Sequence, residues 1–226
     1  MAYKIPFNKI LSINEAVKYL TKTKENYDIG EEGNFFKNCS EWLNSNHNSL
    51  HSIITHSCTG ALEVAAILSK IIPGDEVIIP SFTFVSTASA FALRGAILKF
   101  ADIDINTLNI DASKIEKLIT SKTKIIIVVH YAGVSCDMDK IMKIAKNYNL
   151  TVIEDAAQAI CSKYKGRPCG SIGEIGCLSF HQTKNINCGK GGAILINKEN
   201  LIERSEVITS KGTNRSAFLS GKVDKY

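Results

Sequence analysis

The chain has 226 residues, of which 45% are hydrophobic and 22% charged, and its net charge is +5. This composition is that of a globular protein and excludes a disordered tail or a collagen-like repeat. The mild positive charge suits an anionic small molecule but falls far short of the basic surface of a nucleic-acid binder. No apolar run reaches the roughly 18 residues that cross a bilayer, and residues 1–8 lack the apolar core of a signal peptide. We therefore expect a cytoplasmic protein with neither a nucleic-acid nor a membrane partner.

Helical and extended patterns alternate along the chain. Helices are expected, in chain order, over residues 12–26, 37–46, 59–71, 84–93, 111–120, 137–148 and 198–210. Strands are expected over residues 52–56, 76–79, 97–102, 124–130, 151–154, 176–180 and 192–197. Runs such as residues 125–129 are apolar on both faces, which is typical of buried strands covered by helices. The pattern predicts one α/β domain built on a mostly parallel sheet.

Seven cysteines are spread along the sequence without any Cys-x-x-Cys pair. An odd number with no paired spacing indicates neither a disulfide framework nor a zinc site. We expect reduced thiols that pack as small hydrophobic side chains, and no bound metal.

Polar and aromatic residues follow several of the predicted strands, where ligands bind in sheets of this kind. They lie in the runs 57–61 (SCTGA), 81–84 (SFTF), 130–133 (HYAG), 155–158 (DAAQ) and 179–185 (SFHQTKN). The first of these opens a helix, and the backbone amides of a helix N-terminus attract a phosphate group.

Taken singly, each signal has an ordinary structural explanation. Thr59 and Gly60 fit a plain helix start, Asp155 fits an ion pair or a cap, and Lys184 fits a surface lysine. The glycines of 189–192 fit a tight turn, and His130 and His181 fit structural histidines.

Taken together, the signals fit one cofactor, pyridoxal 5'-phosphate. Its aldehyde forms an imine with a lysine, which points to Lys184. Its pyridine nitrogen stays protonated beside a carboxylate, which points to Asp155, whose charge needs a cationic partner at the end of a buried strand. An aromatic side chain stacks on its ring, and the helix N-terminus holds its phosphate.

Three runs also carry a family resemblance: 74–80 (GDEVIIP), 154–158 (EDAAQ) and 179–185 (SFHQTKN), the last followed by a glycine-rich turn and a strand. With these motifs the chain resembles the DegT/DnrJ/EryC1/StrS sugar aminotransferases over essentially its whole length. The resemblance implies the large domain of the type I aspartate aminotransferase fold, with a mostly parallel seven-stranded sheet flanked by helices. It further implies that residues 1–226 form this cofactor-binding domain and end before the family's C-terminal small domain.

The runs 130–134, 211–216 and 221–226 are similar to the branch of the family that makes dTDP-4-amino-4,6-dideoxygalactose for enterobacterial common antigen. This similarity implies amino transfer from L-glutamate to a dTDP-4-keto-6-deoxyhexose, within cell-surface polysaccharide biosynthesis. It also implies a homodimer with active sites at the subunit interface.

The resemblance assigns roles to individual residues. Lys184 is implied to form the imine and to move the proton between the substrate carbon and the cofactor. The remaining cofactor contacts are implied for Thr59, Gly60 and Ser179 at the phosphate, Asp155 at the pyridine nitrogen, Gln158 at the phenolic oxygen, Phe84 on the ring face and His181 beside the cofactor. Sugar 3-dehydratases of the same superfamily carry a histidine in place of this lysine, so Lys184 favours amino transfer.

Alternatives stay open at this point. Aminotransferases acting on a dTDP-3-keto-6-deoxyhexose share most of the same motifs, and a truncated, non-catalytic remnant would also carry them. A nicotinamide-dependent enzyme is disfavoured because no Gly-x-Gly-x-x-Gly run follows the first strand. Lys190 is one departure, since relatives commonly have an acidic residue in this glycine turn.

Overall fold

The expected strands assemble into one sheet in the computed structural model, which describes residues 14–26 and 33–225. Seven strands are hydrogen-bonded in this sheet: β1 (His51–Thr55), β2 (Glu76–Pro80), β3 (Ile97–Ala101), β4 (Thr123–Val129), β5 (Thr151–Asp155), β8 (Ile175–Ser179) and β9 (Gly192–Ile196). Each of them matches a predicted strand to within one residue at either end. Residues 12 and 13 of the first predicted helix, and the run 1–8 tested for a signal peptide, lie outside the described residues.

Helices connect the strands and flank the sheet. The α-helices of the described residues are α1 (Asn14–Asn26), α2 (Asn34–His47), α3 (Cys58–Leu68), α4 (Val85–Ala92), α5 (Ala112–Ile115), α6 (Met138–Tyr148), α7 (Ile202–Thr209) and α8 (Arg215–Leu219). Short 3-10 turns accompany them at η1 (Glu116–Leu118), η2 (Tyr131–Gly133) and η3 (Glu199–Leu201).

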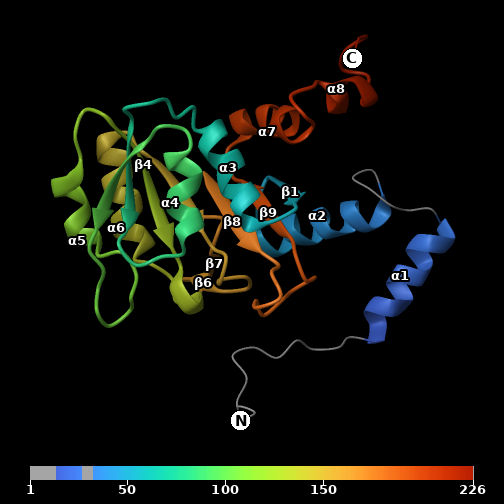
Figure 1. Cartoon of the computed structure of the whole chain (residues 1–226), viewed down its shortest axis with the longest axis horizontal. Coiled ribbons are helices and arrows are strands. Elements are labelled where there is room, and N and C mark those ends of the chain that lie inside the picture. The colour runs from blue at the N-terminus through green and yellow to red at the C-terminus, as the bar shows by residue number, and fades with distance from the viewer. Residues whose placement is uncertain (1–13, 27–32, 226) are drawn as a thin grey trace.

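The strand order is β1-β9-β8-β5-β4-β2-β3. Strand β9 runs antiparallel to both of its neighbours, and the remaining pairings are parallel. The carboxyl ends of β1, β2, β4, β5 and β8 therefore share one edge of the sheet with the start of β9. This edge faces downward in Figure 1, where the loop after β8 hangs below the arrowheads.

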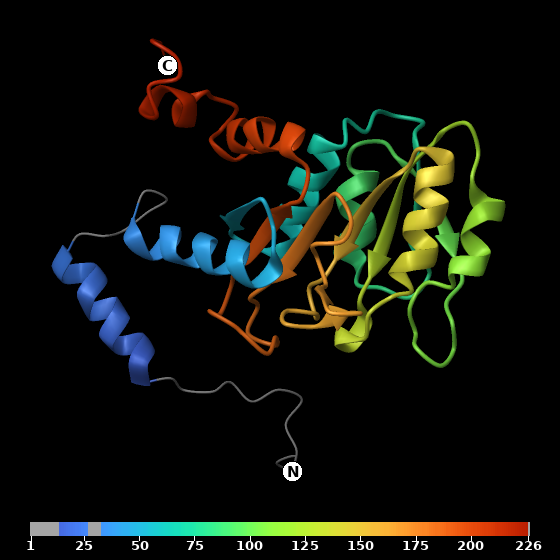
Figure 2. The same ribbon diagram turned by 180° about the vertical axis from the view of Figure 1, so that it is seen from behind.

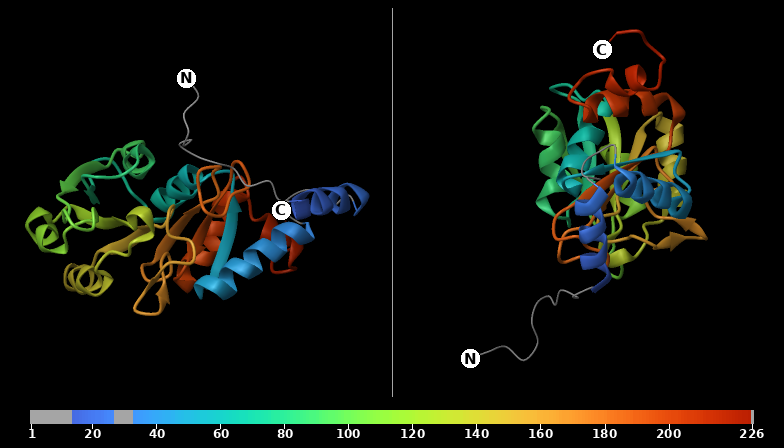
Figure 3. Two further views of the ribbon diagram at one scale, coloured as in Figure 1. Left: turned by 90° about the horizontal axis from the view of Figure 1, so that it is seen from below. Right: turned by 90° about the vertical axis from the view of Figure 1, so that its right-hand side faces the viewer.

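Helices cover both faces of the sheet, and Figure 2 shows the face opposite to that of Figure 1. Alternate residues of one strand enter different cores: Ile125 and Ile127 pack beneath α3 and α4, whereas Ile126 and Val128 pack beneath α5 and α6. The view along the sheet in Figure 3 shows the resulting three layers. This alternation explains why the strand sequences are apolar throughout.

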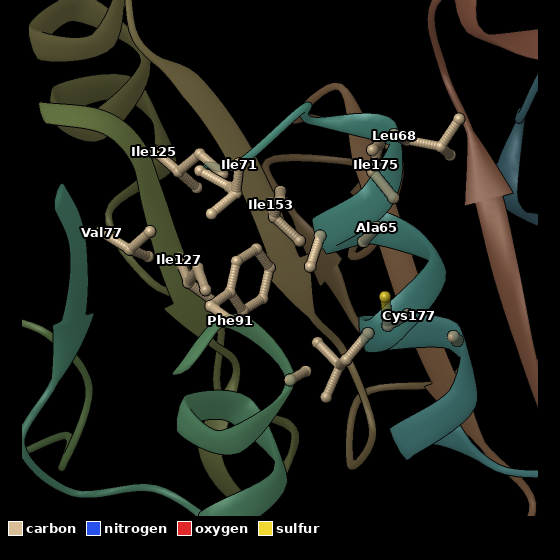
Figure 4. Packing of buried hydrophobic residues seen from close by; sticks show 14 of the residues in the cluster. Ala65, Leu68, Ile71, Val77, Phe91, Ile125, Ile127, Ile153, Ile175 and Cys177 are labelled. Carbon is tan, nitrogen blue, oxygen red and sulfur yellow. The ribbon is translucent and has the colours of Figure 1, made fainter. Parts of the chain in front are cut away.

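The larger core lies between the sheet and the pair α3 and α4 (Figure 4). Phe91 of α4 is fully buried against Ile127 and its neighbours, and Ala65 of α3 allows that helix to approach β8 closely. Fully burying an aromatic or branched aliphatic side chain contributes about 1.5–3 kcal/mol. Helices α3 and α4 are thus firmly fixed over the strands whose ends carry the polar residues.

Four features differ most from the sequence prediction. The hairpin of β6 (Lys163–Tyr164) and β7 (Arg167–Pro168), and the helix α8, were not predicted. The helix expected over residues 111–120 is a single α-turn that continues as the 3-10 turn η1. The helix expected over 198–210 likewise begins as the 3-10 turn η3 and ends at Thr209.

Candidate cofactor site

The loops at the carboxyl edge bring most of the predicted site residues to one region. Strand β1 leads to the start of α3, β2 leads to the start of α4, and β5 ends at Asp155. Strand β8 ends at Ser179 and leads into the loop that carries Lys184. Open α/β sheets bind their ligands outside the carboxyl ends of their strands, which is this edge.

The start of helix α3 has the features of an anion site. The Ser57 hydroxyl accepts a hydrogen bond from the Gly60 amide at 3.1 Å, which makes Ser57 the N-cap. The Thr59 and Ser86 hydroxyls lie 2.8 Å apart, which ties this turn to helix α4. Thr59 and Gly60, the predicted phosphate contacts, therefore lie in a turn whose dipole favours a negative charge.

Asp155 is a buried carboxylate held at both oxygens. Its Oδ2 accepts a 2.7 Å hydrogen bond from the Thr87 hydroxyl, and its Oδ1 accepts one of 3.1 Å from the Ala157 amide. Burial raises the pKa of Asp155 above its ordinary value, while these hydrogen bonds and the nearby Lys184 ammonium act in the opposite direction. A carboxylate has about four lone-pair sites, so two accepted hydrogen bonds leave capacity for a further donor.

Lys184 lies in a loop ordered by its own backbone. Its amide donates to the His181 carbonyl at 2.8 Å, and the Asn187 side chain donates to the Lys184 carbonyl at 3.3 Å. Lys184 is half-buried. Its positive charge acts to lower the pKa of Asp155 and of Cys58, but burial has the larger effect and raises the pKa of both. The two residues predicted to act at opposite ends of the cofactor ring thus lie at the same edge of the sheet.

The other residues of the β8 loop adopt defined positions. Ser179 is buried, and its hydroxyl accepts a 3.3 Å hydrogen bond from the His181 amide. The exposed His181 ring uses Nδ1 to accept from the Thr183 amide at 3.3 Å. Lys190 is exposed in the glycine turn that precedes β9.

Aromatic and amide side chains line the same edge. Phe84 precedes helix α4 and leaves 69% of its surface exposed, so one ring face can cover a planar ligand. Phe82 and Tyr131 pack with ring centroids 4.5 Å apart. The Gln158 carbonyl oxygen accepts a 2.7 Å hydrogen bond from the Ala132 amide, which fixes the orientation of this side chain.

Glu154 and His130 form a fully buried pair on the opposite face of the sheet from Asp155. The His130 Nδ1 accepts from the Cys136 amide at 3.2 Å, so its Nε2 carries the proton directed to Glu154 at 2.8 Å. Burial alone raises the pKa of Glu154, but the bonds from His130, Gly173 and Gly170 outweigh it, and the pKa is lowered. His130 is therefore a structural histidine, as one of the two sequence interpretations expected.

Sequence reasoning missed Thr87, Ser86 and Glu154. A signal for Glu154 was present, since it is a charged residue inside an apolar strand.

All seven cysteines lie in the described part of the chain, and all are free thiols. Across the described residues there is no group of three or more His, Cys, Asp or Glu side chains arranged to hold a metal ion. Among those same residues, none of the helices combines the length and the apolar character that crossing a bilayer demands.

The donor set fits pyridoxal phosphate. An amine, a buried carboxylate with remaining acceptor capacity, a capped helix N-terminus and an exposed aromatic face meet the aldehyde, the pyridine nitrogen, the phosphate and the ring of this cofactor. A helix N-terminus alone would suit any anion, so the combination with Lys184 and Asp155 is what selects this group.

Comparison with known proteins supports the same assignment. SpsC of Bacillus subtilis, a spore coat polysaccharide biosynthesis protein, is 45% identical over 168 residues, which cover 74% of this chain and 43% of SpsC. GDP-perosamine synthase of Caulobacter vibrioides is 41% identical over 162 residues, which cover 72% of this chain and 44% of that protein. The chain thus spans less than half the length of these curated relatives.

Solved structures share the fold. An aminotransferase from Psychrobacter cryohalolentis matches with a TM-score of 0.84 at 36% identity, covering 89% of this chain and 52% of that chain. Spr1654 from Streptococcus pneumoniae in its PLP form matches with a TM-score of 0.83 at 29% identity, covering 92% and 56%. DesI in the presence of its TDP-sugar product matches with a TM-score of 0.83 at 29% identity, covering 92% and 52%.

These matches confirm the predicted fold class and the prediction of pyridoxal phosphate as the cofactor. The sequence profile of the DegT/DnrJ/EryC1/StrS aminotransferase family matches residues 12–223. The chain therefore belongs to the DegT/DnrJ/EryC1/StrS aminotransferase family.

Proposed function

We propose that residues 1–226 are the cofactor-binding large domain of a nucleotide-sugar aminotransferase. One observation carries the proposal: the positive charge of Lys184 acts on the buried Asp155 carboxylate to lower its pKa, at the sheet edge where helix α3 begins. An amine and a buried carboxylate on one sheet edge, beside a helix N-terminus, suit a pyridoxal phosphate enzyme better than a simple anion-binding protein.

Each residue has an assigned task. When bound, pyridoxal phosphate supplies an electron-accepting ring that stabilises the charge left on a carbon that loses its proton. Lys184 would hold the cofactor at its aldehyde through the side-chain amine and would carry the proton that leaves the substrate carbon. Asp155 keeps a proton on the pyridine nitrogen, and Phe84 covers the ring.

The remaining contacts orient the cofactor. Thr59, Gly60 and Ser179 bind its phosphate at the start of α3 and the end of β8. Gln158, whose carbonyl oxygen is held by Ala132, uses its NH2 group to donate to the phenolic oxygen. His181, in the loop after β8, lies beside the cofactor.

The proposed reaction transfers an amino group from L-glutamate to a dTDP-4-keto-6-deoxyhexose. Its products are 2-oxoglutarate and dTDP-4-amino-4,6-dideoxygalactose, so the amino group and the carbonyl oxygen change places between donor and acceptor. The runs 130–134 and 211–216 support this acceptor. Two relatives support a nucleotide-linked sugar as the class of acceptor: GDP-perosamine synthase by its name, and DesI by the TDP-sugar product in its solved structure.

We further assign the chain to a cytoplasmic homodimer that serves surface polysaccharide synthesis. The name of SpsC supports the process. Exposed apolar side chains in the loops after β2, β4 and β8 and at the first residue of α4 support a docking surface at the site, namely Phe82, Phe84, Val85, Val134 and Ile186. Exposed groups of this kind are typical of binding surfaces.

The direct test is the half-reaction with L-glutamate. The chain loaded with pyridoxal phosphate should lose its visible absorbance band on addition of L-glutamate and release 2-oxoglutarate. Lys184→Ala should show neither change, whereas Lys190→Ala, a matched control in the same loop, should show both. A wild-type chain that takes up no cofactor would indicate a non-catalytic remnant.

The acceptor is tested in the second half-reaction. The chain is incubated with L-glutamate and, separately, with the 4-keto and the 3-keto dTDP-sugar, and the aminated carbon is identified by NMR. Amination at C4 is the expected result. Amination of the 3-keto sugar alone would overturn the proposed substrate while leaving the aminotransferase assignment in place.

A further inference from the structure

Helix α4 supplies two adjacent hydroxyls to the candidate cofactor site. The Ser86 hydroxyl contacts Thr59 at 2.8 Å, and the Thr87 hydroxyl contacts Asp155 at 2.7 Å. One turn of helix therefore reaches both the phosphate end and the pyridine end of the site. Because Phe91 anchors this helix in the core, the spacing between the two ends is set by a rigid element.

Thr87 is the better placed of the two for an effect on chemistry. Its side chain is fully buried, so its hydroxyl must find its partners inside the protein. Those partners are the Asp155 Oδ2 at 2.7 Å and the Thr83 hydroxyl at 2.8 Å. An ionised carboxylate only accepts hydrogen bonds, so the Thr87 proton goes to Asp155 and the Thr83 proton goes to Thr87.

This chain of donors has a defined direction only while Asp155 is ionised. If the carboxyl is protonated, its proton can be donated to Thr87, and the two hydroxyl protons turn outward. The arrangement Thr83 to Thr87 to Asp155 thus stabilises the charged carboxylate, and hydrogen bonds to a charged group are stronger than neutral ones.

We propose that Thr87 is a positioning residue of the cofactor site, and that its hydroxyl, ordered by Thr83, holds Asp155 oriented and ionised toward the pyridine nitrogen. The inference rests on the proposed function, because it assigns the role of Asp155 to pairing with that nitrogen. It adds a residue pair that touches neither the phosphate nor the reacting carbon.

The surroundings of Asp155 make such a donor necessary. Burial raises the pKa of this carboxyl, and the Thr87 hydrogen bond is the largest influence that lowers it. The titratable groups that act on it are Cys58 from α3, Cys177 from β8 and Lys184 after β8, and from the opposite face of the sheet His130 after β4. A neutral carboxylic acid cannot hold a proton on the pyridine nitrogen, so the ionised state matters for the cofactor.

The test compares Thr87→Val, which keeps the shape and removes the hydroxyl, with Thr87→Ser, which keeps the hydroxyl. In titrations of the full chain with pyridoxal phosphate, Thr87→Val should bind at least about tenfold more weakly than wild type, and Thr87→Ser should stay within about threefold. Thr83→Val leaves the direct bond to Asp155 in place and should cost about threefold or less.

A matched control separates this role from stability. The Thr120 hydroxyl donates to the buried Glu76 carboxylate at 2.6 Å, at the amino end of β2 and away from the site. Thr120→Val should lower the urea midpoint much as Thr87→Val does, yet leave cofactor affinity unchanged. Equal losses of affinity in the two variants would show that Thr87 acts through stability alone and would overturn the proposal.

Two NMR readouts complete the test. With 15N-labelled pyridoxal phosphate bound, the pyridine nitrogen should shift toward its unprotonated signal in Thr87→Val and not in Thr87→Ser. In the cofactor-free chain, the 13C-labelled Asp155 carboxyl should take up its proton at a higher pH in Thr87→Val than in wild type. The second readout needs no cofactor, so an unchanged Asp155 titration refutes the Thr87 role even if the wild-type chain binds no pyridoxal phosphate and the proposed function fails.

Discussion

Two adjacent acidic residues of strand β5 show how residue position decides chemistry. Asp155 and Ile153 share the face beneath α3 and α4, whereas Glu154 and Val152 share the face beneath α6. Burial dominates at Asp155 and raises its pKa, while hydrogen bonds dominate at Glu154 and lower its pKa. The first carboxyl is left with capacity for a ligand, and the second is fully used within the fold.

Glu154→Gln should destabilise the fold strongly. Glu154 accepts hydrogen bonds from His130 and from the amides of Gly170, Ile172 and Gly173, and a glutamine NH2 would face donors in place of an acceptor. Leaving a buried donor without its acceptor costs roughly 1–3 kcal/mol of unfolding free energy for each donor, and more where the lost acceptor is charged. Urea denaturation measures the loss, with the exposed Glu203→Gln as control. Equal midpoints for the two variants would contradict this account.

The same variant should change the acid dependence of stability. The pKa of Glu154 is lowered in the fold, so its contribution is fully present above its ordinary pKa of 4.5 and is lost as the pH falls through the folded value. The pKa of Asp155 is raised in the fold, so its ionised form destabilises the protein at neutral pH, and this destabilisation disappears as the pH falls. The stability gap between wild type and Glu154→Gln should therefore narrow below pH 4.5; a gap that stays constant from neutral to acidic pH would refute the linkage.

Sequence reasoning found the residues whose chemistry is unusual for their position. Lys184 after a buried strand, Asp155 at the end of another and the small residues at the start of α3 stood out, and the structure places them at one edge. It could not find Thr87, because a threonine in a helix carries no signal until its partner across the core is known. The bond between Thr87 and Asp155 joins residues 68 positions apart in the chain.

At the scale of elements, close backbone contacts hold the site together. An added Cβ at Gly192 would lie 2.4 Å from the Cys58 amide nitrogen and 2.8 Å from the Leu178 carbonyl oxygen. Strand β9 can therefore begin against the first turn of α3 only because residue 192 is a glycine. The glycine turn thus has a packing function as well as the tight-turn function expected from the sequence.

Gly192→Ala should separate β9 from the start of α3. Both contacting groups are backbone and cannot rotate away, so we expect a loss of roughly 1–3 kcal/mol in unfolding free energy. The neighbouring Gly191→Ala is the matched control, because its added Cβ would meet mainly the Cys188 sulfur, which can move. Urea midpoints and cofactor titrations of both variants measure the effect, and equal behaviour of the two would contradict it.

The elements themselves were predictable where the pattern was long and periodic. All seven sheet strands were anticipated, and the central ones most clearly, because runs such as residues 125–129 are apolar and buried on both faces. The hairpin of β6 and β7 was not, because it depends on distant contacts: Lys165 and Arg167 both bind Asp139 of helix α6, at 2.6 and 2.7 Å. Such pairings have no local sequence signature.

At the scale of the whole molecule, the chain holds one half of a larger arrangement seen among its relatives. The structural matches cover 89–92% of this chain but only 52–56% of the three solved chains described above. The proposed cofactor residues nevertheless lie within this half, on the strand ends of one sheet. We therefore expect cofactor binding to be a property of the described domain.

The central claim is that the carboxyl edge of the sheet binds pyridoxal phosphate through Lys184. The most direct measurement is borohydride reduction of the chain mixed with pyridoxal phosphate, followed by peptide mapping by mass spectrometry. The account predicts a single predominant adduct on Lys184, with Lys190 unmodified. An adduct spread over surface lysines, or centred on any residue other than Lys184, would contradict it.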